Sequence, residues 1–362
     1  MRKLLRPRIV IPAVLGAGMI VALFTLADAR KVLDVILGFQ HTYLLYFFGL
    51  MIIYEIVRCT QWHYLLRSLG IRAPLRSQIF AFAVGEITKS LPIGNYFQNY
   101  MLRQSQGTNF GLSSVATSLI LLTEVVVSLV GVEILGLDGW NGWLRLTILI
   151  GVTIALLVGA FATWIFRQSR DSVQRRVWAI RHPTLRRVVE ELDHYRQGIG
   201  TIARPRVLSI QTVLSAMYLS AAAVGLYVLA KGAGAGNISL GEAMAVYFFS
   251  LAVGLIVPIP VDIGLIEFSG IGAFLAIGVG RDTAIGIMLL NRILSLGAAM
   301  LIAVIVMLCL PGELRAALRG TPHEEPITPP SPPVAVRDAA RTRREEPPRR
   351  TRAGDEQQYV RP

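Results

Sequence analysis

Charged side chains inside apolar stretches are the residues of this 362-residue chain best placed to do chemistry. Eight ionisable residues interrupt segments that are otherwise apolar: Glu55, Arg58, Glu86, Lys89, Glu124, Asp262, Glu267 and Arg292. An ionisable group at membrane depth is costly unless it is paired or hydrated, so each is a candidate functional residue. We expect the arginines of this set to contact an anionic lipid phosphate, and a carboxylate such as Glu124, Glu267 or Asp262 to balance a cation or a proton.

Local ion pairing is the competing interpretation of these charges. Glu55 and Arg58 are three residues apart, as are Glu86 and Lys89, and this spacing lets two side chains neutralise each other on one helix face. Glu124 and Arg292 have no such neighbour. We expect these two either to pair with each other or to bind a charged ligand.

The composition indicates which class of protein holds these charges. Hydrophobic residues make up 53% of the chain and charged residues only 16%, which excludes a soluble globular enzyme and predicts a polytopic membrane protein. The net charge of +13 lies between long apolar runs, so it argues for membrane topology rather than a nucleic-acid partner. The two cysteines and five histidines lack the spacing of a metal site, and we predict no metal and no cofactor.

Apolar runs of about 20 residues predict the membrane spans. Six full spans are expected, at residues 9–27, 42–66, 112–135, 146–166, 207–230 and 284–310. The first follows four basic residues and resembles a signal peptide, but its apolar run is longer than that of a cleaved one, so we expect an uncleaved anchor. Counting cations in the short loops places both termini on the cytoplasmic side of the membrane.

Two further apolar segments, 79–101 and 243–280, begin and end on the same side under this count. Pro92 interrupts the first, and Pro258 with Pro260 interrupts the second, where each proline removes an amide donor. An Ala-Val-Gly triplet precedes each break, at 83–85 and 252–254. Oppositely oriented, interrupted hairpins are typical of inverted-repeat transporters. We therefore predict an all-α polytopic membrane protein with about six transmembrane helices and two re-entrant hairpins.

Two polar segments complete the domain organisation. Residues 167–206 hold ten arginines against four acidic residues, with apolar residues at helical spacing. This segment lies along anionic phospholipid headgroups in one interpretation, and is a topology signal only in the other. Ten of the 18 prolines lie in 311–362. We predict a transmembrane domain at 1–315 and a disordered, Pro/Arg-rich cytoplasmic tail at 316–362.

Short motifs along the chain add to the prediction of a polytopic membrane protein. Arg58, Trp62, Leu65 and Leu66 form an R-x-x-x-W-x-x-L-L stretch; Leu91 and Pro92 precede Arg103 and Gly107; Glu124 follows on a helix; Pro258, Pro260, Gly264 and Glu267 form a proline-rich hairpin; and Arg292 lies on the last helix. In this order the motifs resemble the lysylphosphatidylglycerol synthase transmembrane-domain family, flippase-like proteins of bacteria and archaea. The combined substrate-binding candidates are Arg58, Trp62, Lys89, Pro92, Gly94, Arg103, Glu124, Pro258, Pro260, Asp262, Gly264, Glu267 and Arg292.

The resemblance implies movement of a phospholipid or polyprenyl-linked lipid between the two leaflets of a bacterial cytoplasmic membrane. The soluble aminoacyl transferase domain of the full synthases has no counterpart in these residues, so we expect a transporter rather than an enzyme. Two alternatives stay open: an integral-membrane transferase in glycolipid, hopanoid or polyprenyl-phosphate metabolism, and a non-transporting partner of a lipid synthase. A homo-oligomer is also left open.

Overall fold

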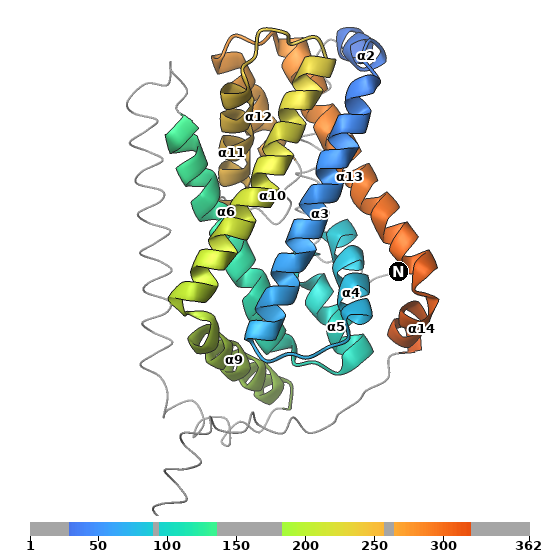
Figure 1. Cartoon of the computed structure of the whole chain (residues 1–362), viewed down its shortest axis with the longest axis vertical. Coiled ribbons are helices and arrows are strands. Elements are labelled where there is room, and N and C mark those ends of the chain that lie inside the picture. The colour runs from blue at the N-terminus through green and yellow to red at the C-terminus, as the bar shows by residue number, and fades with distance from the viewer. Residues whose placement is uncertain (1–28, 90–93, 136–182, 257–263, 320–362) are drawn as a thin grey trace, which may run out of the picture. The chain divides into compact units, whose positions relative to one another are not determined.

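The computed structural model describes residues 29–89, 94–135, 183–256 and 264–319. Every regular element in these ranges is a helix (Figure 1). The elements are α2 (Ala29–Leu37), α3 (Thr42–Ser68), α4 (Leu75–Thr88), the short 3₁₀ helix η1 (Gly94–Tyr96), α5 (Phe97–Gln106), α6 (Phe110–Leu135), α9 (Pro183–Ile202), α10 (Pro205–Gly232), α11 (Leu240–Ile256), α12 (Leu265–Ala276), α13 (Arg281–Cys309) and α14 (Pro311–Arg319). The chain divides into two units, 1–323 and 324–362, and all described residues belong to the first.

Four of these helices, α3, α6, α10 and α13, are long and apolar enough to cross a membrane. They contain 26 to 29 residues each, which at 1.5 Å per residue gives about 40 Å, more than the hydrocarbon core requires. They coincide with four of the six predicted spans. The other two, 9–27 and 146–166, lie outside the described residues.

Helices α3 and α10 run antiparallel along each other. At one end the Gln40 amide donates to the Gly232 carbonyl over 3.1 Å, and toward the other end Gln61 Nε2 donates to Ser215 Oγ over 2.7 Å. Because the two helices end at opposite ends of the bundle, the elements that follow them start there too. In Figure 1, α4 and α5 therefore lie toward the lower end, and α11 and α12 toward the upper end.

The two helix pairs, α4 with α5 and α11 with α12, each have a close contact at the glycine of an Ala-Val-Gly triplet. A Cβ on Gly85 of α4 would collide with Gln98 of α5, and a Cβ on Gly254 of α11 would collide with Ile266 of α12. The two glycines thus occupy equivalent places, where the second helix of a pair comes closest to the first. The predicted proline breaks between the helices fall at 90–93 and 257–263, outside the described residues.

Helix α9 packs against the start of α6. It forms most of the described part of the arginine-rich segment 167–206, and it also contacts α3. Glu191 accepts a hydrogen bond from the Gly111 amide over 2.6 Å and pairs with Arg103 Nη1 of α5 at 2.9 Å. A carboxylate at a helix N-terminus satisfies amides that have no partner within the helix. One acidic residue thereby fixes α9 to both α5 and α6.

Candidate functional site

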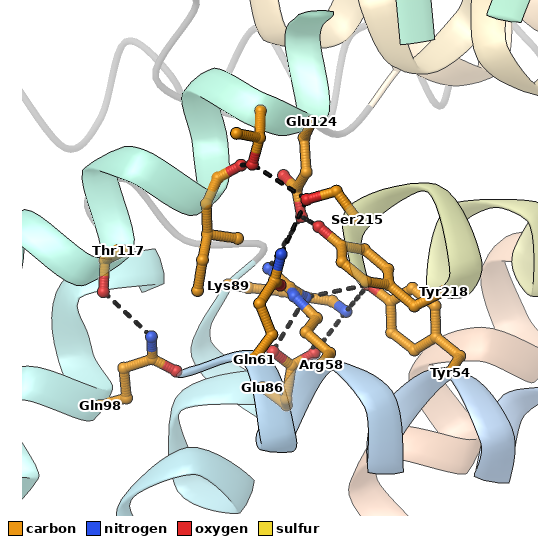
Figure 2. A network of polar contacts seen from close by, with 12 residues as sticks. Tyr54, Arg58, Gln61, Glu86, Lys89, Gln98, Thr117, Glu124, Ser215 and Tyr218 are labelled. Atoms are coloured by element: carbon orange, nitrogen blue, oxygen red, sulfur yellow. Dashed lines mark hydrogen bonds and ion pairs between the residues drawn. The ribbon is translucent and has the colours of Figure 1, made fainter. Parts of the chain in front are cut away.

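A cluster of two cations and two carboxylates lies buried between α3, α4 and α6. Arg58 Nη1 is 2.9 Å from Glu86 Oε1, and Arg58 Nη2 is 3.4 Å from Glu124 Oε1 (Figure 2). Lys89 Nζ is 2.5 Å from Glu86 Oε2. Both carboxylates and Arg58 are less than a tenth exposed. The formal charges within this cluster balance, which is how buried ions avoid the full cost of leaving water.

Two tyrosines complete the charged cluster. Tyr54 OH accepts hydrogen bonds from Arg58 Nη1 at 2.9 Å and from Lys89 Nζ at 3.5 Å, and Tyr218 OH donates to Glu124 Oε1 over 2.6 Å. The guanidinium carbon lies 5.7 and 5.9 Å from the two ring centroids, within cation–π range. Sequence reasoning missed both tyrosines. Tyr54 carries one signal, its position one helical turn before Arg58, whereas Tyr218 on α10 carries none.

A second ion pair joins α12 to α13. Arg292 Nε is 3.4 Å from Glu267 Oε1. The other oxygen of Glu267 accepts the Gly264 amide over 2.6 Å, at the start of α12. Glu267 is only 4% exposed, so its two oxygens serve a helix start and a cation at the same time. This arrangement fixes where Arg292 lies.

The charged cluster around Arg58 and the Glu267–Arg292 pair both border one cavity of about 160 Å³, which we call the central cavity. Its wall takes residues from α3, η1, α6, α10, α11, α12 and α13, together with Lys89 just after the end of α4. The charged residues that line it are Glu55, Arg58, Lys89, Glu124 and Arg292. Asn95 and Asn291 add amide groups. The cavity can therefore offer three cations and several hydrogen-bond donors to one anionic group.

A belt of neutral polar side chains holds the surrounding helices together. Ser215 of α10 bonds Gln61 of α3 at 2.7 Å and Thr123 of α6 at 2.9 Å, and Gln211 Nε2 donates to Thr123 at 3.2 Å. On the other side of α6, Gln98 Nε2 donates to Thr117 over 3.0 Å. Hydroxyl and amide groups inside apolar bundles find partners on neighbouring helices, so these bonds set the depth and rotation of each helix.

The structure places some of the predicted substrate-binding residues together. Arg58, Lys89, Glu124 and Arg292 line the central cavity, and Glu267 contacts it through Arg292. The predicted local pair Glu86–Lys89 is present. Arg58 forms its ion pairs with Glu86 and Glu124 of other helices, rather than with Glu55 three residues away.

Other predicted residues lie elsewhere. Trp62 is fully buried in a hydrophobic core, with its ring 6.2 Å from that of Phe82. Arg103 pairs with Glu191 at the α9 end. Gly94 is buried where a Cβ would collide with the Thr88 carbonyl, and Gly264, at φ 101°, starts α12. Pro92, Pro258, Pro260 and Asp262 lie outside the described residues.

Comparison with known proteins identifies the family of this chain. Within the described part of the chain, no group of three or more His, Cys, Asp or Glu residues could hold a metal ion. No curated protein matches the chain. The family model described as "Lysylphosphatidylglycerol synthase TM region" matches residues 9–305, which confirms the family predicted from the motifs. The chain, an integral membrane protein, belongs to the lysylphosphatidylglycerol synthase transmembrane-region family.

Proposed function

We propose that the protein moves an anionic or polyprenyl-linked lipid between the two leaflets of the bacterial cytoplasmic membrane. The observation that carries this proposal is the central cavity, where Arg58, Lys89 and Arg292 lie within a bundle of apolar helices. Buried cations that are costly to keep in a membrane protein mark ligand and ion pathways.

The ion pairs suggest how a lipid phosphate is held. Each cation of the cavity already has a carboxylate partner, at 2.5 to 3.4 Å. A phosphate offers the same kind of acceptor oxygens, so it exchanges for a carboxylate without leaving a cation unpaired. Tyr218 and the Gly264 amide keep Glu124 and Glu267 hydrogen-bonded while their cations turn to the ligand. The site then returns to its own ion pairs after the lipid leaves.

The two helix pairs supply the alternation between leaflets. Helices α4, α5 and α12 have 14, 10 and 12 residues, too few to cross the hydrocarbon, and α11, with 17 residues, is at the lower limit for a span. In our proposal each pair dips into the membrane from one side, the first from the cytoplasm and the second from outside. Rocking of one pair against the other opens the central cavity to one leaflet at a time.

The test measures sidedness of lipid transport in proteoliposomes. Native mass spectrometry first identifies the lipid that co-purifies with the full chain, and a fluorescent form of that lipid then reports its movement. Arg292→Gln is expected to slow transport at least about tenfold, equivalent to about 1.4 kcal/mol. Arg281→Gln, an exposed arginine at the start of the same helix, is the matched control and should leave the rate unchanged. Full transport by Arg292→Gln would overturn the proposal.

The same preparation separates the competing functions. Turnover of a polyprenyl-phosphate sugar by the purified protein, without lipid movement, would assign a transferase. Deleting residues 316–362 should leave transport intact, whereas loss of a cellular lipid product on that deletion alone would assign a scaffold for a synthase. Transport that depends on anionic phospholipid would support the proposed contact between the 167–206 segment and the headgroups.

A further inference from the structure

A second hollow runs along the outside of the bundle between α3, α4 and α13. It has a volume of about 520 Å³, and its wall is almost entirely apolar. Its three sides are formed by Ile56 and Cys59 of α3, Ile79 and Phe82 of α4, and Val306 of α13, among others. Ile52, Ile56 and Leu75 on its rim are 52%, 60% and 53% exposed, so the groove opens sideways, away from the bundle. We call it the lateral groove.

The lateral groove meets the central cavity at one residue. Glu55 lines both of them. The two other polar residues of the groove are engaged locally: the Thr60 hydroxyl donates to the Ile56 carbonyl over 2.7 Å, and the His63 ring is hydrogen-bonded to Gln78 at 2.7 Å. A charged cavity and an apolar groove therefore adjoin at Glu55, and this matches the division of polarity within a single lipid molecule.

The length of the groove matches one leaflet. Along α3 its lining runs from Ile52 to His63, a rise of about 16 Å at 1.5 Å per residue. The hydrocarbon core of a bilayer is about 30 Å thick, so half of it is about 15 Å. The exposed faces of α3 and α13 beside the groove are also apolar, including Ile53 and Val304. The groove thus lies where acyl chains surround the protein.

We propose that the lateral groove holds one acyl chain of the lipid whose headgroup occupies the central cavity, with Glu55 at the junction of the two. This proposal rests on the transport function proposed above and specifies how the substrate lies. In the orientation expected from the loop charges, the chain extends from Glu55 toward the cytoplasmic end. The bilayer side of the groove lets the chain enter and leave without crossing the charged cluster.

Photo-crosslinking tests where the chain lies. The probe is a phosphatidylglycerol that carries a diazirine in the middle of one acyl chain, incorporated into proteoliposomes of the full chain. Mass spectrometry is expected to find label on the groove-lining stretches of α3 and α4. Val306→Trp, which fills the groove, should reduce this label at least about threefold, whereas Val304→Trp on the outer face of the same helix should not.

A second pair of variants keeps the test decisive if Val306→Trp fails to fold. Ile56→Trp fills the groove from α3, and Ile53→Trp is its control, because Ile53 is 51% exposed and lies outside the groove lining. Label that is equal in groove and control variants would overturn the proposal. So would an unlabelled groove in which Cys59 forms a disulfide with a cysteine introduced into the predicted span 9–27, because the chain itself would then fill it.

The transport assay distinguishes failure of this proposal from failure of the proposed function. If wild-type protein moves lipid and Val306→Trp moves it equally fast, the groove assignment is wrong while the transport function stands. If the wild type moves no lipid but the groove is labelled and Val306→Trp removes the label, the acyl-chain site stands while the transport function fails. A short-chain lipid with the same headgroup should be moved equally by Val306→Trp and Val304→Trp.

Discussion

Arg58 Nη1 lies 2.9 and 3.0 Å from the two carboxylate oxygens of Glu86, a residue 28 positions later in the chain and on another helix. The same guanidinium group extends to Glu124 on a third helix. Arg58 therefore connects α3, α4 and α6 at the wall of the central cavity. Its position gives it two roles, to stabilise the bundle and to offer a cation to a ligand.

Replacing Arg58 by Met is expected to destabilise the protein strongly. The change leaves the carboxylates of Glu86 and Glu124 without this buried partner, a loss of about 3–5 kcal/mol for ion pairs of this kind. Reversible unfolding in mixed detergent micelles measures the free energy. The double variant Arg58→Met with Glu86→Gln should regain part of the loss. A single variant within about 1 kcal/mol of wild type would show that the pair contributes little.

Tyr218→Phe isolates one hydrogen bond of the charged cluster. The ring stays beside Arg58, but Glu124 loses a hydroxyl donor at 2.6 Å. A hydrogen bond to a charged group contributes about 1.5–3 kcal/mol, and we expect a loss of that size in the same unfolding assay. Tyr227→Phe, on the same helix and only partly buried, is the control and should change stability by less than about 0.5 kcal/mol. Equal effects of the two variants would contradict the assigned bond.

Alanine substitution should raise the stability of the protein at one helical glycine and lower it at another. At Gly49 nothing lies within 4 Å of an added Cβ, so Gly49→Ala should stabilise α3 by up to about 1 kcal/mol through helix propensity. At Gly85 the added Cβ meets the backbone and Cβ of Gln98, so Gly85→Ala should lower the melting temperature instead. Thermal unfolding in detergent compares the two. A rise at both sites would mean that α4 and α5 are not closely packed.

Variants of Arg103 and of its partner Glu191 distinguish a structural role of Arg103 from a contact with the ligand. Its guanidinium is half exposed and pairs with Glu191 of α9. If docking of α9 is its role, then Arg103→Gln and Glu191→Gln should have the same small effect on transport, and each should cost at most about 1 kcal/mol of stability. Transport and unfolding are measured on both variants and at two salt concentrations. A loss of transport confined to Arg103→Gln would support the headgroup contact implied by the family motif.

The carboxylate of Glu242, at the start of α11, should make a contribution to stability that depends on pH. The Ser239 backbone amide and hydroxyl both donate to its carboxylate at 2.8 Å, and they hold the pKa of Glu242 below its ordinary value. A carboxylate whose pKa is lower in the folded than in the unfolded state stabilises the fold at pH values above its unfolded-state pKa of about 4.3. This stabilisation is lost as the pH falls through the folded-state pKa. The melting temperature of Glu242→Gln should therefore be below that of wild type at neutral pH, and the gap should close in acid. A gap that is independent of pH would contradict this.

Local patterns were enough to predict the helices, the family and one ion pair. The long apolar runs predicted α3, α6, α10 and α13, because hydrophobicity and helical periodicity are properties of a continuous stretch of chain. The spacing of Glu86 and Lys89 predicted their contact for the same reason. The substrate-binding roles of the cavity residues stay predictions.

The tertiary structure decided which charges meet across helices. The spacing of Glu55 and Arg58 allowed a pair along one helix, yet Glu86 and Glu124 are the partners of Arg58, and Tyr218 joins them from α10. Contacts of this kind depend on the depth and rotation of packed helices. The close approach at Gly85 and the hydroxyl and amide bonds between α3, α6 and α10 set that packing. These constraints join residues far apart in the chain, so no local pattern contains them.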